Sequence, residues 1–190
     1  MFESIMGWDF QILNFIQEHL RNGFLDTVLA ALSHAGKAGI IWIVCCVVML
    51  FFKKTRAAGL IALVAMGIGY LLGDHVIKPL IARPRPFATE SDLNVFRNAE
   101  LIVSKPSGFS FPSGHSAAAA AFATVTLAKN RVIGLIALLP VLLMMFSRLY
   151  LYVHFPSDVL SGAVLGILSA VLMLLIFRAT KLDKKLSPRA

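Results

Sequence analysis

The chain has 190 residues, of which 58% are hydrophobic and only 15% charged, with a net charge of +8 at pH 7. Mean hydropathy is +0.79, and a soluble domain of this length cannot bury that much apolar surface. The composition therefore excludes an ordinary soluble protein and indicates a single all-α integral membrane domain over residues 1–190.

The N-terminal segment, residues 1–34, is open to two interpretations. From residue 9 onward, apolar side chains recur at near-helical spacing (Phe10, Ile12, Leu13, Phe15, Ile16 and Leu20). This pattern predicts an amphipathic helix in the membrane interface. A second short helix, residues 25–33, would then lead into the first span through a break at Gly36 and Gly39. The alternative is an additional membrane crossing made from residues 9–34.

Five later segments are long and apolar enough to cross a bilayer. They cover about residues 34–52, 57–77, 112–128, 132–153 and 157–177. We therefore expect a bundle of five transmembrane helices, or six if residues 9–34 also cross. Gly162 and Gly166, four residues apart, belong to a small-residue face that suits close helix packing, and we expect this packing within one chain.

Basic residues mark one side of the predicted bundle. Ten of the eighteen Lys and Arg lie at three junctions that alternate onto one face: Lys53, Lys54 and Arg56; Lys129 and Arg131; Arg178, Lys181, Lys184, Lys185 and Arg189. The positive-inside rule makes this side the cytoplasm, with residues 178–190 as a basic cytoplasmic tail. The loop 79–111 and the turn near 154–156 then lie on the outer side. The positive charge thus gives no reason to expect a nucleic-acid partner.

A second set of polar residues lies at the outer ends of the spans: Lys78, Arg83, Arg85, Ser113, Gly114, His115, Ser147, Arg148, His154 and Asp158. Arg148 is the most informative, because a charge within a span costs about 3 kcal/mol and normally faces a polar cavity or a partner. Taken singly, each residue has an ordinary explanation, such as a snorkelling arginine or an interfacial histidine. Their convergence on one face predicts a site.

The residue types in this set suit a phosphate. Three cations, Lys78, Arg85 and Arg148, offer many N–H donors to a tetrahedral oxyanion. A helix beginning at Pro112 would point the free N–H groups of residues 113–115 at the anion, with the Ser113 hydroxyl as a further donor and Gly114 allowing close approach.

Two histidines and one acid add reactivity. In "HFPSD", Pro156 marks a helix start that places Asp158 within reach of His154. A carboxylate that accepts from one ring nitrogen makes the other a better nucleophile. His115 could protonate a leaving oxygen, so the set specifies phosphoryl transfer through a phosphohistidine. A zinc site is the rival, but nearby cations oppose a divalent ion and no acidic cluster is present.

Three segments carry a family resemblance: Lys78-x6-Arg85-Pro86, then Pro112-Ser-Gly-His115, then Ser147-Arg148-x5-His154-x3-Asp158. In this order and spacing they resemble the signature motifs of the type 2 phosphatidic acid phosphatase superfamily, and residues 78–158 would form its catalytic core. The resemblance implies that Lys78, Arg85, Ser113, Gly114 and Arg148 hold phosphate. It also implies that His154 attacks phosphorus, that Asp158 orients His154, that His115 protonates the leaving group, and that no metal or other cofactor is needed.

Two neighbouring features fall outside the motifs. Arg83 is expected to contact the loop or a lipid headgroup at most, and the segment "PSGF" at 106–109 lacks the histidine. The 79–111 loop, which carries Phe87, Phe96, Arg97 and Lys105, is expected to shape headgroup choice.

The expected substrate is a lipid phosphate anchored by its tails, since each buried CH₂ adds about 0.8 kcal/mol to membrane partitioning. Undecaprenyl diphosphate is the first candidate, because its recycling needs an outward site in a bacterial cytoplasmic membrane. Phosphatidylglycerophosphate and phosphatidate phosphatases, or a lipid phosphotransferase, are alternatives. The polar groups cluster at one face, which argues against a transporter or channel. Besides the lipid bilayer and the substrate, no obligate protein partner is expected.

Overall fold

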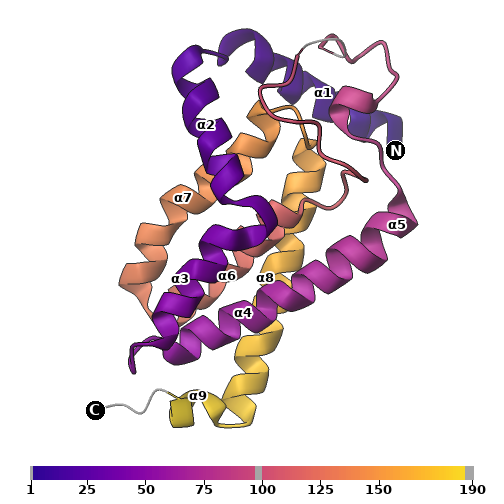
Figure 1. Cartoon of the computed structure of the whole chain (residues 1–190). Helices are drawn as coiled ribbons and strands as arrows, with labels where there is room; N and C mark the ends of the chain where they lie inside the picture. Colours follow the sequence, from indigo (N-terminus) through magenta and orange to yellow (C-terminus); the bar gives the residue numbers. More distant parts are fainter. Residues whose placement is uncertain (1, 97–99, 187–190) are drawn as a thin grey trace.

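The computed structural model describes residues 2–96 and 100–186, and every regular element in this part of the chain is helical, as predicted. The first elements are α1 (Phe2–His19), α2 (Gly23–Ala35), the 3₁₀ helix η1 (Lys37–Gly39) and α3 (Ile40–Leu50). They are followed by α4 (Arg56–Tyr70), the π-helical η2 (Leu71–Ile77), α5 (Lys78–Ile81) and the 3₁₀ helix η3 (Pro86–Ala88). The last elements are α6 (Gly114–Lys129), α7 (Arg131–Tyr150), α8 (Pro156–Ala179) and α9 (Leu182–Leu186) (Figure 1).

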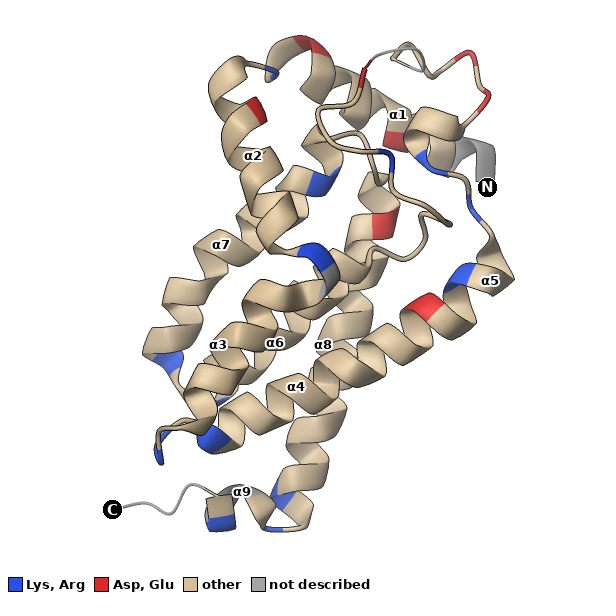
Figure 2. Cartoon of the chain, viewed as in Figure 1, with Lys and Arg blue, Asp and Glu red and all other residues tan. Residues whose placement is uncertain are grey.

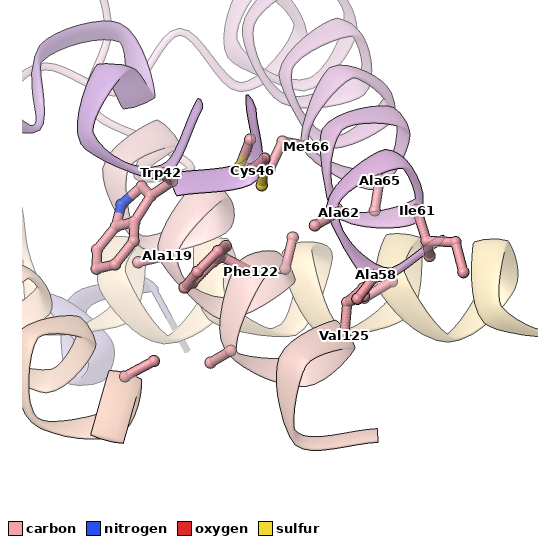
Figure 3. Packing of buried hydrophobic residues seen from close by; sticks show 14 of the residues in the cluster. Trp42, Cys46, Ala58, Ile61, Ala62, Ala65, Met66, Ala119, Phe122 and Val125 are labelled. Carbon is pink, nitrogen blue, oxygen red and sulfur yellow. The ribbon is translucent and has the colours of Figure 1, made fainter. Parts of the chain in front are cut away.

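α6 is the central helix of the bundle and packs against α4, α7 and α8. Five of its alanines are buried (Ala117, Ala119, Ala120, Ala121 and Ala123). Small side chains let neighbouring helices approach closely, which is the main source of packing where lipid replaces water. On the side of α6 that faces α3, two large aromatic side chains fill the space. The ring centroids of Phe122 and Trp42 lie 5.2 Å apart (Figure 3).

The contact between α6 and α8 depends on two glycines. A Cβ added at Gly162 would collide with the carbonyl oxygen of Ser113, and one added at Gly166 would collide with that of Ala117. The small-residue face of α8 therefore meets α6 inside one chain, as predicted. Because Ser113 directly precedes α6, this contact also fixes the start of that helix.

Three stretches are long and apolar enough to cross a membrane: Arg56–Ala88, α7 and α8. α2 and α3 are bent by 56° relative to each other and add a fourth stretch if the pair crosses as one broken span. The break lies where the glycines predicted it, and Gly39 has a φ of 73°, which favours glycine. Taken as one span, this pair covers residues 23–50, whereas the prediction was 34–52. α6 has 16 residues, about 24 Å of the roughly 30 Å needed, so the number of crossings stays a prediction.

α1 lies across one end of the bundle, over α7 and α8 (Figure 1). It is not among the helices suited to crossing a membrane. Phe10, Leu13 and Ile16 are buried against the bundle, whereas Trp8 and Phe15 are exposed on the other side. This arrangement favours the interfacial alternative for α1, while α2 enters the bundle.

The two ends of the bundle differ in charge (Figure 2). The α3–α4 and α6–α7 junctions and the chain after α8, all rich in Lys and Arg, share one end, as the predicted topology requires. Part of the predicted basic tail forms the short helix α9, which packs against α4 and α8. Arg189 lies outside the described residues. The long loop, the α7–α8 turn and α1 share the opposite end.

Candidate active site

The backbone of the α7–α8 turn sets the position of His154. The carbonyl of Arg148 accepts from the N–H groups of Val153 (3.2 Å) and His154 (3.3 Å), which closes the end of α7. Tyr152 takes the left-handed conformation in this turn (φ 59°), a position that glycine usually occupies. Its hydroxyl donates to Asn94 Oδ1 (2.7 Å), which ties the turn to the long loop.

Asp158 lies in the first turn of α8, where it is fully buried. Its Oδ2 accepts from the N–H of Phe155 (2.8 Å) and lies 3.5 Å from Nδ1 of His154. That separation is longer than a formed hydrogen bond, and Nδ1 has no hydrogen-bond partner among the described residues. The Asp158 carboxylate is thus held beside the imidazole by its own helix N-terminus.

Arg83 completes the surroundings of Asp158, and its predicted role as a loop or headgroup contact is wrong. Its Nη1 donates to Asp158 Oδ1 (2.8 Å), and its Nη2 donates to Asp9 Oδ2 (2.6 Å) on α1. Sequence analysis counted Arg83 among the polar residues of the outer face but gave it the wrong role, and it missed Asp9. The only available signal was an aspartate on the face of α1 that carries Phe10 and Leu13.

Arg85 contacts the opposite side of the turn. Its Nη1 donates to the carbonyl of Val153 (2.9 Å) and lies 3.2 Å from Nε2 of His154. Since arginine can only donate, Nε2 accepts and the ring proton is left on Nδ1. Nε and Nη2 of Arg85 donate to the carbonyls of Gly108 (3.1 Å) and Ser107 (3.3 Å). The P-S-G segment at 106–108, which lacks the histidine, therefore holds Arg85 in place.

The start of α6 differs from the prediction by two residues. The helix begins at Gly114 with Ser113 as N-cap, and the Ser113 N–H donates to the carbonyl of Asp158 (3.0 Å). The prediction that this amide is free is therefore wrong. The Ser113 Oγ accepts from the N–H (3.4 Å) and hydroxyl (3.0 Å) of Ser116. The amides of Gly114 and His115 have no comparable partner in the described part of the chain and remain available to an anion.

Arg148 comes from the last turn of α7 and is only 4% exposed. Its Nε donates to Ser147 Oγ (3.3 Å), and its Nη1 lies 3.4 Å from Nε2 of His115. Its Nη2 is buried and has no partner among residues 2–96 and 100–186. A buried donor left unpaired costs about 1–3 kcal/mol, so its presence is expected where a ligand completes the bonding.

Lys78 enters from the start of α5 and is paired. Its Nζ donates to Asp74 Oδ1 (2.5 Å), one turn earlier in η2. The other oxygen of Asp74 lies beside α6, where a Cβ added at Gly114 would be 3.2 Å from it. Asp74 was not predicted, although a π-helical turn of this kind is often found at functional sites.

These elements enclose one cavity of about 680 Å³. Most of the predicted site residues line it: Lys78, Arg85, Gly114, His115, Arg148 and His154. Ser113 and Asp158 are fully buried and do not line it. Asp74 and Lys37 line it without having been predicted. The remaining walls are largely apolar and come from α3, α4 and α6 (Ile43, Leu63, Met66, Tyr70 and Ala118).

The long loop contributes Pro106 and Ser107 to the cavity. Phe87 and Phe96 pack instead among the apolar residues beneath α1, and Lys105 lies over the Phe87 ring. Phe87, Phe96 and Lys105 thus do not line the cavity, and Arg97 lies outside the described residues; that the loop shapes headgroup choice stays a prediction.

Burial determines the protonation of His154. Removal from water lowers the pKa of its imidazole to about 4; Arg85 and Arg148 act in the same direction, and Asp158 opposes them. The ring is therefore neutral at neutral pH, as a nucleophile must be. Among the described residues, no three His, Cys, Asp or Glu side chains gather as ligands for a metal ion.

Comparison with known proteins identifies the family. Residues 58–181 match the PAP2 superfamily, the group that the three motifs resemble. The chain belongs to the PAP2 superfamily. An undecaprenyl-diphosphatase from Sulfolobus acidocaldarius is 31% identical over 158 residues, which cover 83% of this chain and 71% of that protein. Phosphatidylglycerophosphatase B from Bacillus subtilis is 33% identical over 181 residues, covering 88% and 79%.

A solved structure shares the fold of this PAP2 protein. The crystal structure of the first transmembrane PAP2 type phosphatidylglycerolphosphate phosphatase from Bacillus subtilis matches it with a TM-score of 0.71 at 29% identity, over 93% of this chain and 87% of that one. The predicted helical membrane architecture is confirmed, and the protein is a membrane phosphatase.

Proposed function

We propose that this PAP2 protein hydrolyses a lipid phosphate or diphosphate without a metal, through a phosphohistidine on His154. The observation that carries the proposal is one cavity lined by Lys78, Arg85 and Arg148 together with His115 and His154, with a buried donor of Arg148 still unpaired in the described part of the chain. A phosphate offers enough acceptor oxygens for all three cations and for the free amides of α6.

In the first step, the lone pair of His154 Nε2 forms a bond to phosphorus, and the bond from phosphorus to the lipid-side oxygen breaks. The electrons of that bond leave with the oxygen, which takes a proton from His115 in its imidazolium form; the negative charge of the bound phosphate offsets Arg148 and favours that form. Asp158 lies on the Nδ1 side of the ring and stabilises its developing positive charge. Arg85 turns its Nη1 from Nε2 to a phosphate oxygen, which exposes the nucleophile as the substrate binds.

In the second step, water attacks phosphorus and gives a proton to the now neutral His115. The phosphorus–nitrogen bond breaks, its electrons return to Nε2, and inorganic phosphate is released. Lys78, Arg148 and the amides at Gly114 and His115 hold the phosphoryl oxygens in both steps. Ser113 does not line the cavity, so its contribution is to cap α6 and hold the Gly114 and His115 amides in place.

The shape of the cavity supports a lipid substrate. Charged groups gather at one part of it, whereas α3, α4 and α6 supply apolar walls that suit a hydrocarbon chain. Undecaprenyl diphosphate is the first candidate, because the Sulfolobus relative bears the name of that activity. Phosphatidylglycerophosphate is the second candidate, because the Bacillus relative is named for it.

The charge distribution supports an outward orientation. The basic junctions share the end opposite the cavity residues of the α7–α8 turn, so the positive-inside rule puts those junctions and the C-terminus in the cytoplasm. The site then faces the exterior of a bacterial cytoplasmic membrane, at headgroup depth.

The test is inorganic phosphate release by purified protein in the presence of EDTA. The panel contains undecaprenyl diphosphate, phosphatidylglycerophosphate and phosphatidate, with His154→Ala and the surface variant His19→Ala as a matched pair. We expect release by the wild type and by His19→Ala, and none by His154→Ala or His115→Ala. Full activity without His154 would disprove the phosphohistidine. No release from any lipid would contradict hydrolysis and favour phosphotransfer to another lipid.

A further inference from the structure

One guanidinium links the N-terminal helix to the proposed catalytic acid. The Arg83 fork donates from Nη1 to Asp158 (2.8 Å) and from Nη2 to Asp9 (2.6 Å), and both carboxylates are fully buried. The guanidinium also lies 3.9 Å above the ring of Phe155. A planar fork with two carboxylates and an aromatic face is a geometry that arginine provides and lysine does not.

Asp9 also holds the turn itself. Its Oδ1 accepts from the backbone N–H of Ser157 (2.9 Å), and its Oδ2 accepts from the Ser157 hydroxyl (2.5 Å). Nearby, the rings of Phe10 and Phe155 meet edge to face. α1 therefore contacts the residues on both sides of Pro156, between His154 and Asp158.

The charges of the cluster explain why two carboxylates share one arginine. Arg83 with Asp158 alone would be neutral, and the carboxylate would contribute little negative potential at the imidazole. Asp9 returns one negative charge to the cluster, which in a dry environment acts over several ångströms. The ring of His154 becomes positive when it bonds to phosphorus, so that negative charge stabilises the intermediate.

We propose that Asp9 and Arg83 are positioning residues of the reaction: through Arg83, Asp9 aims the Asp158 carboxylate at Nδ1 of His154 and keeps the cluster negative. The inference rests on the proposed function for its catalytic consequence. Neither residue lines the cavity, so neither touches the substrate. The competing explanation is that Asp9 merely anchors α1 to α8.

The test compares Asp9→Asn with Glu18→Gln, which removes the same charge from an exposed position on the same helix. The proposal expects kcat to fall at least tenfold in Asp9→Asn with KM within twofold, and Glu18→Gln to match the wild type. Asp9→Glu, which keeps the charge, should recover part of the lost kcat. A mere anchor would lower the amount of folded protein and leave the kcat of the folded fraction unchanged.

A second measurement does not depend on turnover. In ¹⁵N-histidine spectra at neutral pH, with His154 assigned through His154→Asn, Asp9→Asn and Arg83→Lys should shift the Nδ1 resonance of His154, whereas Glu18→Gln should not. Unchanged resonances in folded Asp9→Asn would overturn the proposal. Loss of the folded state in both Asp9→Asn and Arg83→Lys would also overturn it, in favour of an anchor. A wild type that releases no phosphate would instead count against the proposed function and leave this measurement valid.

Discussion

The two sides of the His154–Asp158 turn use similar residues but differ in how completely they are bonded. On the side of α1, Arg83 donates to two carboxylates and Asp9 accepts from Arg83 and twice from Ser157. On the side of the cavity, Nη2 of Arg148 is buried without a hydrogen-bond partner in the described part of the chain. Unpaired buried donors destabilise a fold, so they are kept where a ligand satisfies them. The α1 side therefore holds the turn in place, and the cavity side keeps a donor available to a ligand.

The largest effect is expected from Arg148→Ala, on the cavity side. Removal of one preorganised donor to a developing oxyanion costs about 10²–10³-fold in kcat. Arg148→Lys keeps the charge but loses the fork, so it should recover only part of the rate. Phosphate release by detergent-solubilised protein, with Arg21→Ala at the α1–α2 turn as a matched control, measures both. An Arg148→Ala variant as active as Arg21→Ala would remove the distinction between the two sides.

A smaller loss is expected from Gly162→Ala. The added methyl group collides with the Ser113 carbonyl and displaces the start of α6, at a stability cost of about 1–3 kcal/mol. A displacement near 1 Å reduces turnover by up to about 10²-fold. Thermal unfolding and phosphate release measure the two effects. Gly7→Ala is the control, since its added Cβ has nothing within 4 Å; equal behaviour of the two variants would show that α6 can move without cost.

The pH dependence tests the neutral nucleophile. The pKa of His154 is about 4, so protonation removes the Nε2 lone pair only in acid, and kcat/KM should fall about tenfold per pH unit below that value. Between pH 5 and 7 the His154 step should hardly change, whereas an ordinary histidine would lose half its activity near pH 6.5. Rates from pH 3.5 to 7 in a non-ionic detergent check this. A midpoint near 6.5 would mean that the ring is hydrated and the turn loosely held.

Much of the cavity side could be predicted from the sequence, because its residues contrast with an apolar background. An arginine within a span, a histidine after P-S-G and an aspartate after proline are each unusual there, and the alternation of spans brings them to one end. The short helix at 25–33 and the glycine break after it were predicted and correspond to α2 and the bend, but Asp26 and His34 lower the hydropathy of α2, so it was not counted as part of a span.

The α1 side could not be predicted, because its contacts have no local pattern. Asp9 is 148 residues from Ser157, and no spacing rule connects them. Arg83 and Arg85 are both arginines next to proline in one loop, and only the fold determines which side of the turn each reaches. The Ser113 amide, which was expected to be free, donates to the Asp158 carbonyl because α8 approaches α6 closely at Gly162. No local sequence pattern indicates that approach either.

The smallest effect is expected from Asp74→Asn, the acid on the cavity side. Its carboxylate pairs with Lys78 and lies beside the first residue of α6, so it opposes an anion bound there. Because Asp74 is partly exposed, we expect only about a threefold fall in the inhibition constant of orthovanadate, a phosphate mimic, and less at high salt. The exposed loop variant Asp92→Asn should leave the constant unchanged. A rise in the constant would instead mean that Asp74 aims Lys78, as Asp9 is proposed to aim Arg83, and positioning by a carboxylate would then occur on both sides of the turn.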